Sequence, residues 1–138
     1  MIRIPYTKLP SVSQKEVYLP LVKVRLGYKK THKITPTLIV ALVDSGADVC
    51  FCSEQIGAWL GIQFTKIKKE TTFTAANSTP FTTKPEVLRL YAYGEDYDCK
   101  FYFTDVLPRH TPIILGQLGF FDHFKILFDF KNKVIELG

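Results

Sequence analysis

The chain has 138 residues, of which 46% are hydrophobic and 22% charged, and its net charge of +5 corresponds to an isoelectric point near 9.1. One domain with a substantial core fits these values, and no apolar run approaches the length of a membrane-spanning helix. The three cysteines, Cys50, Cys52 and Cys99, are too few for a disulfide framework. Reduced thiols and the lack of a signal-peptide core in residues 1–15 predict a cytoplasmic protein.

An extended N-terminal arm is expected over residues 1–15, because Pro5 and Pro10 oppose helix formation. A single domain then covers residues 16–138. Its first part, residues 16–28, alternates between apolar and polar side chains, which predicts a strand with one wet face. The apolar face of that strand carries Val22, Val24 and Leu26.

The next elements follow in short succession. Residues 34–44 form a continuous apolar, largely β-branched run, which predicts a strand buried on both faces. Ser53 can cap a short helix that stops at Gly61, with Trp59 and Leu60 packed inward.

The second half of the chain is expected to be mostly strands. Residues 64–85 read as strand, turn and strand, with residues 76–79 at the tip, and residues 86–106 as a second hairpin around Gly94. A short strand, a short helix and two closing strands complete the pattern, at residues 111–116, 117–124 and 125–137. The chain is therefore predicted to be mostly β with two short helices.

The basic residues form two groups. Solvated strand faces and turns account for both, and attraction to nucleic acid or to acidic substrates is the alternative. No basic helix or nucleic-acid motif accompanies them, so a nucleic-acid partner is not expected. The first group comprises Lys23, Arg25, Lys29, Lys30 and Lys33, and the second Lys66, Lys68 and Lys69.

No metal or other cofactor is expected. A zinc site needs about four closely organised ligands, whereas this chain lacks a C-x-x-C pair and its histidines, His32, His110 and His123, are scattered. Cys50 and Cys52 are two residues apart, so they share a face on a strand and read as packing residues.

Asp44 is the residue that composition alone does not explain. It ends the apolar run Leu38–Val43. Moving an isolated carboxylate out of water costs more free energy than the burial of one apolar side chain provides. Two adjacent carboxylates instead share one proton and titrate as a pair. One can then activate a water as a base while the protonated partner donates to a carbonyl oxygen.

The residues after Asp44 suit such a loop. Ser45 can bond to nearby backbone, and Gly46 permits close approach of an amide to the carboxylate. Ala47 is small enough for a second loop to pack against it. The apolar strand is expected to deliver Asp44 into a dry environment.

These motifs resemble the retropepsin-like aspartic proteases, the group of the retroviral proteases and their cellular and prokaryotic relatives. The resemblance rests on Leu42-Val43-Asp44-Ser45-Gly46-Ala47, a flap-like hairpin around Asn77, and Ile114-Leu115-Gly116 before a short helix, and it covers residues 17–137. It implies a closed β-barrel, one lobe of the acid-protease fold. It also implies peptide hydrolysis without a cofactor, with Asp44 as the catalytic residue and with Ser45, Gly46 and Ala47 supporting the catalytic loop.

The resemblance further implies a homodimer. Two-lobed members carry two such loops, whereas the other aspartates here, Asp96, Asp98, Asp105, Asp122 and Asp129, are not followed by Ser/Thr-Gly. The second carboxylate must therefore be Asp44 of another copy, with Ser45 bonding across the twofold axis. The N-terminal arm can supply dimer contacts, as termini do in the retroviral enzymes, or be a loose tail.

Substrate contacts are also implied by the resemblance. Asp48 matches a position that binds substrate backbone in retroviral members, but Gln117 replaces the arginine that partners it there. The flap lacks glycine, and Asn77 is expected to supply the positive φ of its turn. Ile114, with Phe73 and Phe81, is expected to line the site and favour bulky apolar residues in a peptide or protein substrate.

A homodimeric aspartic endopeptidase is thus the expected function. The alternative is a catalytically silent module of the same fold that binds peptides, which the flap and Gln117 motivate. A basic barrel that binds nucleic acid is a third hypothesis. No membrane partner is expected, and the initial Met1 favours a free-standing chain.

Overall fold

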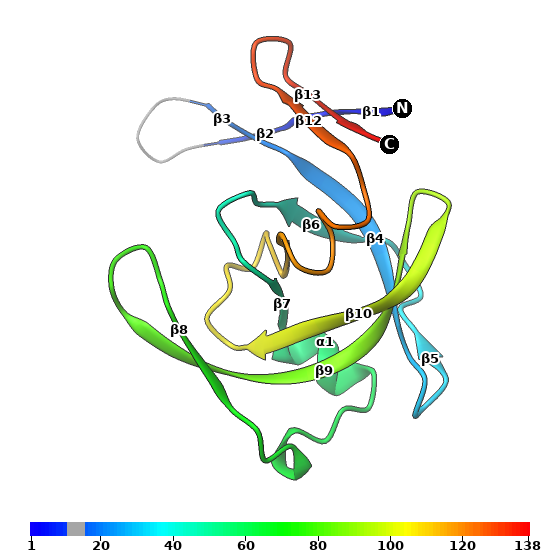
Figure 1. The fold of residues 1–138 in the computed structure, drawn as a ribbon, viewed down its shortest axis with the longest axis vertical. Helices are drawn as coiled ribbons and strands as arrows, with labels where there is room; N and C mark the ends of the chain where they lie inside the picture. Colours follow the sequence, from blue (N-terminus) through cyan, green and yellow to red (C-terminus); the bar gives the residue numbers. More distant parts are fainter. Residues whose placement is uncertain (11–15) are drawn as a thin grey trace.

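The computed structural model describes residues 1–10 and 16–138 (Figure 1). Residues 11–15, the end of the expected arm, lie outside the described residues. The strands are β1 Ile2–Pro5, β2 Thr7–Leu9, β3 Val17–Leu19, β4 Leu21–Tyr28, β5 Lys33–Ile34, β6 Ile39–Val43, β7 Cys50–Ser53, β8 Thr71–Thr74, β9 Pro80–Ala92, β10 Glu95–Thr104, β11 Ile113–Leu115, β12 Ile126–Asp129 and β13 Val134–Leu137. The helices are α1 Glu54–Trp59 and the 3-10 helix η1 Phe64–Lys66.

A closed barrel forms the body of the molecule. Its strands follow the order β4-β6-β11-β7-β10-β9, and pairing of β9 with β4 closes the ring of six. Fully buried side chains fill the interior, among them Leu26, Leu90, Phe101, Ile113 and Leu115. In the described residues no helix is long and apolar enough to cross a membrane.

The alternation read in residues 16–28 is confirmed, but the strand is interrupted. Val22, Val24 and Leu26 are buried and Lys23 and Arg25 exposed. Pro20 separates β3 from β4, because proline has no N–H to donate to a strand ladder.

The prediction that residues 34–44 are buried on both faces is wrong. In β6 only Ala41 and Val43 are fully buried, and Leu38, just before the strand, is 55% exposed. A barrel strand has one inner face, so β6 buries alternate residues despite its uniformly apolar sequence.

Helix α1 begins as expected and packs differently at its end. The Ser53 side chain accepts a hydrogen bond from the Gln55 amide, and Gly61 follows the helix with a φ of +92°. Leu60 is fully buried, but Trp59 is 50% exposed, which corrects the expectation that both pack inward.

Residues 117–124 do not form the expected second helix. Gly119 has a φ of +112°, outside the helical region, and the chain runs through successive turns. Phe120 and Phe124 still pack into the core. The second short helix is instead η1, within residues 64–69 where the sequence predicted a strand.

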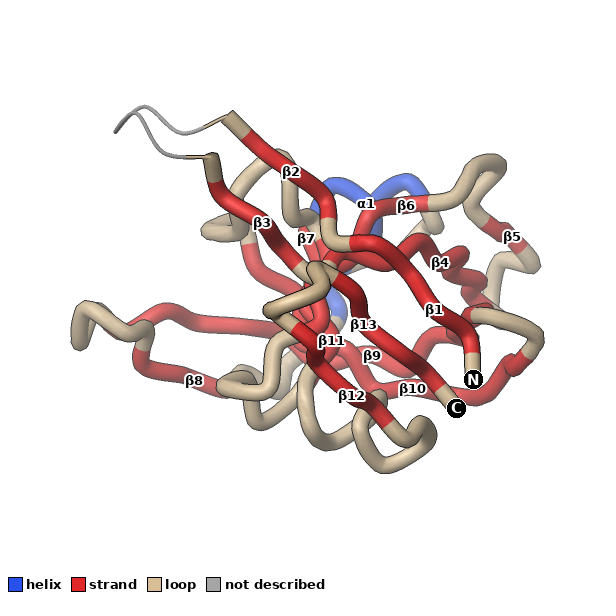
Figure 2. The backbone as a smooth tube through the Cα atoms, turned by 90° about the horizontal axis from the view of Figure 1, so that it is seen from above, coloured by secondary structure: helices blue, strands red, loops and turns tan. Residues whose placement is uncertain are grey.

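The terminal segments form their own sheet. Strand β1 pairs antiparallel with β13, which pairs with β12, and Figure 2 shows the three strands side by side. Strand β2 pairs with β3. The described part of the arm is therefore extended, as expected, and residues 2–5 are not a loose tail.

Candidate active site

Asp44 lies where two parallel strands end. Strand β6 pairs in parallel with β11, with Val43 opposite Leu115, so the loops after both strands emerge at one edge. The Asp44 amide donates to the Leu115 carbonyl at 3.0 Å. The fold therefore brings two motifs that lie far apart along the chain, Asp44-Ser45-Gly46 and Ile114-Leu115-Gly116, into direct contact.

The Asp44 carboxylate is held by its own loop. The Gly46 amide donates to Asp44 Oδ1 at 2.9 Å, and the Ala47 amide donates to the Asp44 carbonyl at 3.2 Å. A backbone N–H donor fixes the orientation of a carboxylate. Amide donation at Gly46 is thus found as predicted.

The expected dry setting is not found in the single chain. Asp44 is only partly buried, and Ser45, Gly46 and Asp48 are exposed. The strand that leads to Asp44 is apolar, but the loop itself lies at the surface.

The segment after β11 is fastened to the Asp44 loop by backbone bonds. The Gln117 amide donates to the Ala47 carbonyl and the Leu118 amide to the Asp48 carbonyl, each at 2.9 Å. Val49 and Leu118 form an isolated parallel bridge. These bonds fix the position of both loops relative to each other.

Gln117 has a role that the sequence did not reveal. Its side-chain Nε2 donates to the Ser45 carbonyl at 2.8 Å. The residue that replaces the arginine of the resemblance thus braces the Asp44 loop and makes no side-chain bond to Asp48. The Asp48 carboxylate takes part in no ion pair among residues 1–10 and 16–138.

The close approach expected at Ala47 depends on Gly116. A Cβ at Gly116 would lie 2.1 Å from the Val49 carbonyl oxygen and 2.6 Å from that of Ala47. Only glycine fits there. The signal was present in the sequence, since Gly116 ends the Ile-Leu-Gly segment.

The cysteines support this arrangement from beneath. The Gly116 amide donates to Cys50 Sγ at 3.4 Å, and Cys99 Sγ donates to the Gly119 carbonyl at 3.5 Å. A hydrogen bond to Cys50 and burial raise the pKa of Cys99, and burial raises the pKa of Cys52. All three are buried free thiols, in agreement with a packing role.

The β8–β9 hairpin corresponds to the expected flap. At its tip the Ala75 amide donates to the Thr79 carbonyl at 2.9 Å, and Asn77 Oδ1 accepts from the Thr79 amide at 3.1 Å. The positive φ, +67°, belongs to Ser78 and not to Asn77. Asn77 therefore stabilises the turn through its side chain.

An aromatic cluster joins the hairpin to the strand after the Asp44 loop. Phe51 lies 5.0 Å from Phe73 and 5.7 Å from Phe81, measured between ring centroids. Ile114 stands opposite Phe51 in the β11–β7 register and opposite Leu42 in β6. The three residues expected to form an apolar wall, Ile114, Phe73 and Phe81, thus gather around Phe51.

Five cavities among the described residues are lined by other segments and not by Asp44. In the same residues, no three His, Cys, Asp or Glu side chains gather as a metal site would require. The Asp44 loop lies at the surface, where Ser45 and Gly46 are exposed.

Comparisons with solved structures identify the fold. A retropepsin-like aspartic protease from Rickettsia conorii is similar over 98% of both chains, with a TM-score of 0.60 and 17% sequence identity. The EIAV protease, in complex with the inhibitor HBY-793, is similar over 79% of this chain and 88% of that chain, with a TM-score of 0.51 and 16% identity. No protein-family model and no curated sequence matches the chain. The chain has a retropepsin-like fold, mostly β with a single lobe, as the resemblance implied.

Proposed function

We propose that the chain is an aspartic endopeptidase that acts as a homodimer, with a dyad made of Asp44 and the Asp44 of a second copy. The observation that carries this proposal is the constrained Asp44 loop. Gly46 holds the carboxylate, while Gln117 and the Gly116 backbone hold the loop. Similarity of the fold to a retropepsin-like aspartic protease from Rickettsia conorii supports the proposal.

The need for a second copy follows from the chemistry. One carboxylate cannot act as base and acid at once, and Asp-Ser-Gly occurs once in the chain. The face around the loop is accessible, since Ser45 and Gly46 are exposed and Leu118, bonded to Asp48, is 65% exposed. A second copy related by a twofold axis beside Asp44 would cover this face and bring the two Asp44 carboxylates together.

The mechanism then uses the chain's own groups. The ionised member of the dyad takes a proton from a bound water, which attacks the peptide carbonyl carbon. The protonated member donates to the carbonyl oxygen, and the dyad later returns a proton to the leaving amine. The β8–β9 hairpin is suited to close over an extended peptide by backbone pairing, and the wall of Ile114, Phe73 and Phe81 favours bulky apolar residues beside the cleaved bond.

The test is cleavage of a mixed peptide library between about pH 4 and 7 by the wild type, by Asp44→Asn and by Asp105→Asn. Asp105 is an exposed aspartate outside the proposed site, so its variant is the matched control. We expect cleavage by the wild type and the control, and a loss of at least about 1,000-fold in Asp44→Asn, because the dyad loses its base. Sedimentation should give a particle of twice 15.8 kDa.

Equal cleavage by wild type and Asp44→Asn would refute the assignment. A strictly monomeric chain would exclude the dyad. A dimer that cleaves no peptide would favour the silent peptide-binding module.

A further inference from the structure

The turn between β4 and β5 is fixed against the end of helix α1. Thr31 Oγ1 donates to the Leu60 carbonyl at 2.6 Å, and Lys33 Nζ donates to the Trp59 carbonyl at 3.3 Å. The Lys33 ammonium also lies over the Trp59 ring, 5.5 Å from its centroid. In Figure 1 β5 and α1 lie in the lower half of the view, away from the two termini near the top.

A small apolar cavity opens beside Trp59. It has a volume of about 200 Å³ and is lined by Thr35, Pro36, Thr37, Ile39, Ile56 and Trp59. Trp59 is 50% exposed, and Leu38, next to the lining residues in the chain, is 55% exposed. Clustered exposure of large apolar side chains is a mark of interaction sites.

The two basic groups of the sequence meet at this end of the molecule. A second cavity, of about 370 Å³, is lined by Lys30 and Thr31 of the turn after β4 and by Gly61, Gln63, Lys66 and Ile67 after helix α1. Lys68 and Lys69 continue from there as exposed residues. Lys30 and Lys66, which the sequence separates by more than thirty positions, thus line one cavity, together with Glu86.

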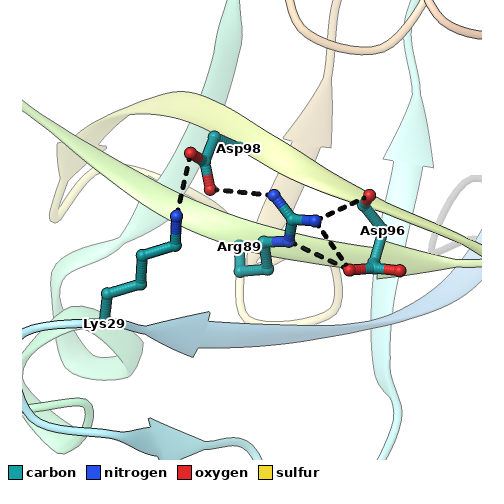
Figure 3. Close-up of polar contacts among 4 residues, drawn as sticks. All are labelled: Lys29, Arg89, Asp96 and Asp98. Carbon is teal, nitrogen blue, oxygen red and sulfur yellow. Dashed lines mark hydrogen bonds and ion pairs between the residues drawn. The ribbon is translucent and has the colours of Figure 1, made fainter.

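Part of this charge is compensated and part is not. Asp98 lies 3.1 Å from Lys29 and 3.2 Å from Arg89, which also contacts Asp96 (Figure 3). Lys30 pairs with Glu86 at 3.4 Å. The ion pairs of the described chain do not include Lys33, Lys66, Lys68 or Lys69.

We propose that this basic-apolar end, defined by Lys33, Ile56, Trp59, Lys66 and the residues between them in space, docks an acidic peptide segment of a partner protein. One bulky apolar side chain of the segment would enter the cavity beside Trp59. Its carboxylates would pair with Lys33 and Lys66, neither of which forms an ion pair within the described part of the chain. Polyanions such as nucleic acid would use the lysines but leave the apolar cavity unused, so the combination favours a peptide. This surface does not depend on catalysis by Asp44.

The test uses Trp59, the one tryptophan of the chain, as a fluorescent reporter. The probe is the peptide acetyl-EEDLFEDE-amide, titrated at 50 mM NaCl. We expect a saturable change of tryptophan emission with a Kd on the order of 10–100 μM, which weakens as salt is raised. The same peptide with Ser-Ser in place of Leu-Phe should bind at least about fivefold more weakly, because it cannot fill the cavity.

Charge reversal identifies the surface. Lys33→Glu should weaken binding about tenfold or more, because an attraction becomes a repulsion. Lys131→Glu, the same change in the turn between β12 and β13, should bind like the wild type, and circular dichroism confirms that both variants fold. Asp44→Asn should also bind like the wild type, which separates this proposal from the proteolytic one.

Absence of any fluorescence response, or equal binding by the wild type and Lys33→Glu, would overturn the proposal. Equal affinity for the Ser-Ser peptide would show that no apolar side chain enters the cavity beside Trp59, and this result would also refute the proposal. Tighter binding of an eight-residue oligothymidylate than of the acidic peptide would assign the surface to nucleic acid instead.

Discussion

Replacing Gly116 with alanine would place a methyl group where backbone atoms of the Asp44 loop already lie. The added carbon would sit 2.1 Å from the Val49 carbonyl oxygen and 2.6 Å from the Ala47 carbonyl oxygen. Non-bonded heavy atoms prefer separations of about 3.5 Å, so the alanine methyl would have to move about 1.4 Å away from the Val49 oxygen and about 0.9 Å away from the Ala47 oxygen. Both contacts are with backbone, and no side-chain rotation can relieve them.

This movement would break the bonds that join the two loops. The bonds at risk are those from the Gln117 amide to Ala47 and from the Asp44 amide to Leu115, at 2.9 and 3.0 Å. A net contribution of about 1 kcal/mol for each, added to an overpacking cost of about 1–3 kcal/mol, gives a loss of about 3–5 kcal/mol. That loss is a large share of the ~5–15 kcal/mol that stabilises a typical domain.

The free energy of unfolding can be measured by urea titration, with circular dichroism as the signal and all proteins at one concentration. Gly94→Ala is the matched control, since a Cβ there meets nothing within 4 Å although φ is +83°. Backbone strain alone should cost the control about 1 kcal/mol. If Gly116→Ala loses no more stability than Gly94→Ala, close contact at Gly116 does not hold the loops together and the reasoning fails.

Two further predictions concern a surface ion pair and the Asp44 loop. Hydrogen bonds from Lys29 and Arg89 hold the pKa of Asp98 below its ordinary value, so its stabilising effect is present above the unfolded pKa of about 3.9 and is lost as pH falls through the lower folded pKa. Asp98→Asn should therefore lower Tm at pH 6, with the difference from wild type closing toward pH 3; a difference that is constant with pH would contradict this. Gln117→Met removes the bond to the Ser45 carbonyl, and we expect a loss of about 1 kcal/mol in unfolding and a lower kcat at unchanged KM in Asp44-dependent cleavage; unchanged kcat would show that this brace is dispensable.

The parts of the fold that sequence predicted are those specified by local signals. The alternation of apolar and polar side chains in residues 16–28 correctly predicted which side chains of β4 face the barrel interior. Ser53 and Gly61 correctly marked the two ends of α1. The loop chemistry at Asp44 was equally local, because Gly46 donates to a carboxylate only two residues away. Such signals need no knowledge of distant contacts.

The errors arose where distant residues decide the conformation. Phe120, Phe121 and Phe124 have helical spacing, yet the Gly119 carbonyl is taken by the Tyr97 hydroxyl at 2.7 Å and the backbone turns instead. Trp59 stays at the surface, where Lys33, the first residue of β5, donates to its carbonyl and lies over its ring. The sequence showed that Gln117 stands where the resemblance implies an arginine. Only the folded chain reveals that its side-chain amide donates to the Ser45 carbonyl.

The Asp44 loop is rigid on one side and open on the other, and this asymmetry bears on the proposed function. Beneath it, Gly116, Gln117 and the buried Cys50 fix the backbone; above it, Ser45 and Gly46 are exposed. A site held within fractions of an ångström needs support of this kind before a second surface completes it. Asp44→Asn leaves that support intact and removes only the carboxylate charge, whereas Gly116→Ala keeps the charge and removes the support. An endopeptidase with an Asp44 dyad must lose activity in both variants, but must lose stability chiefly in the second.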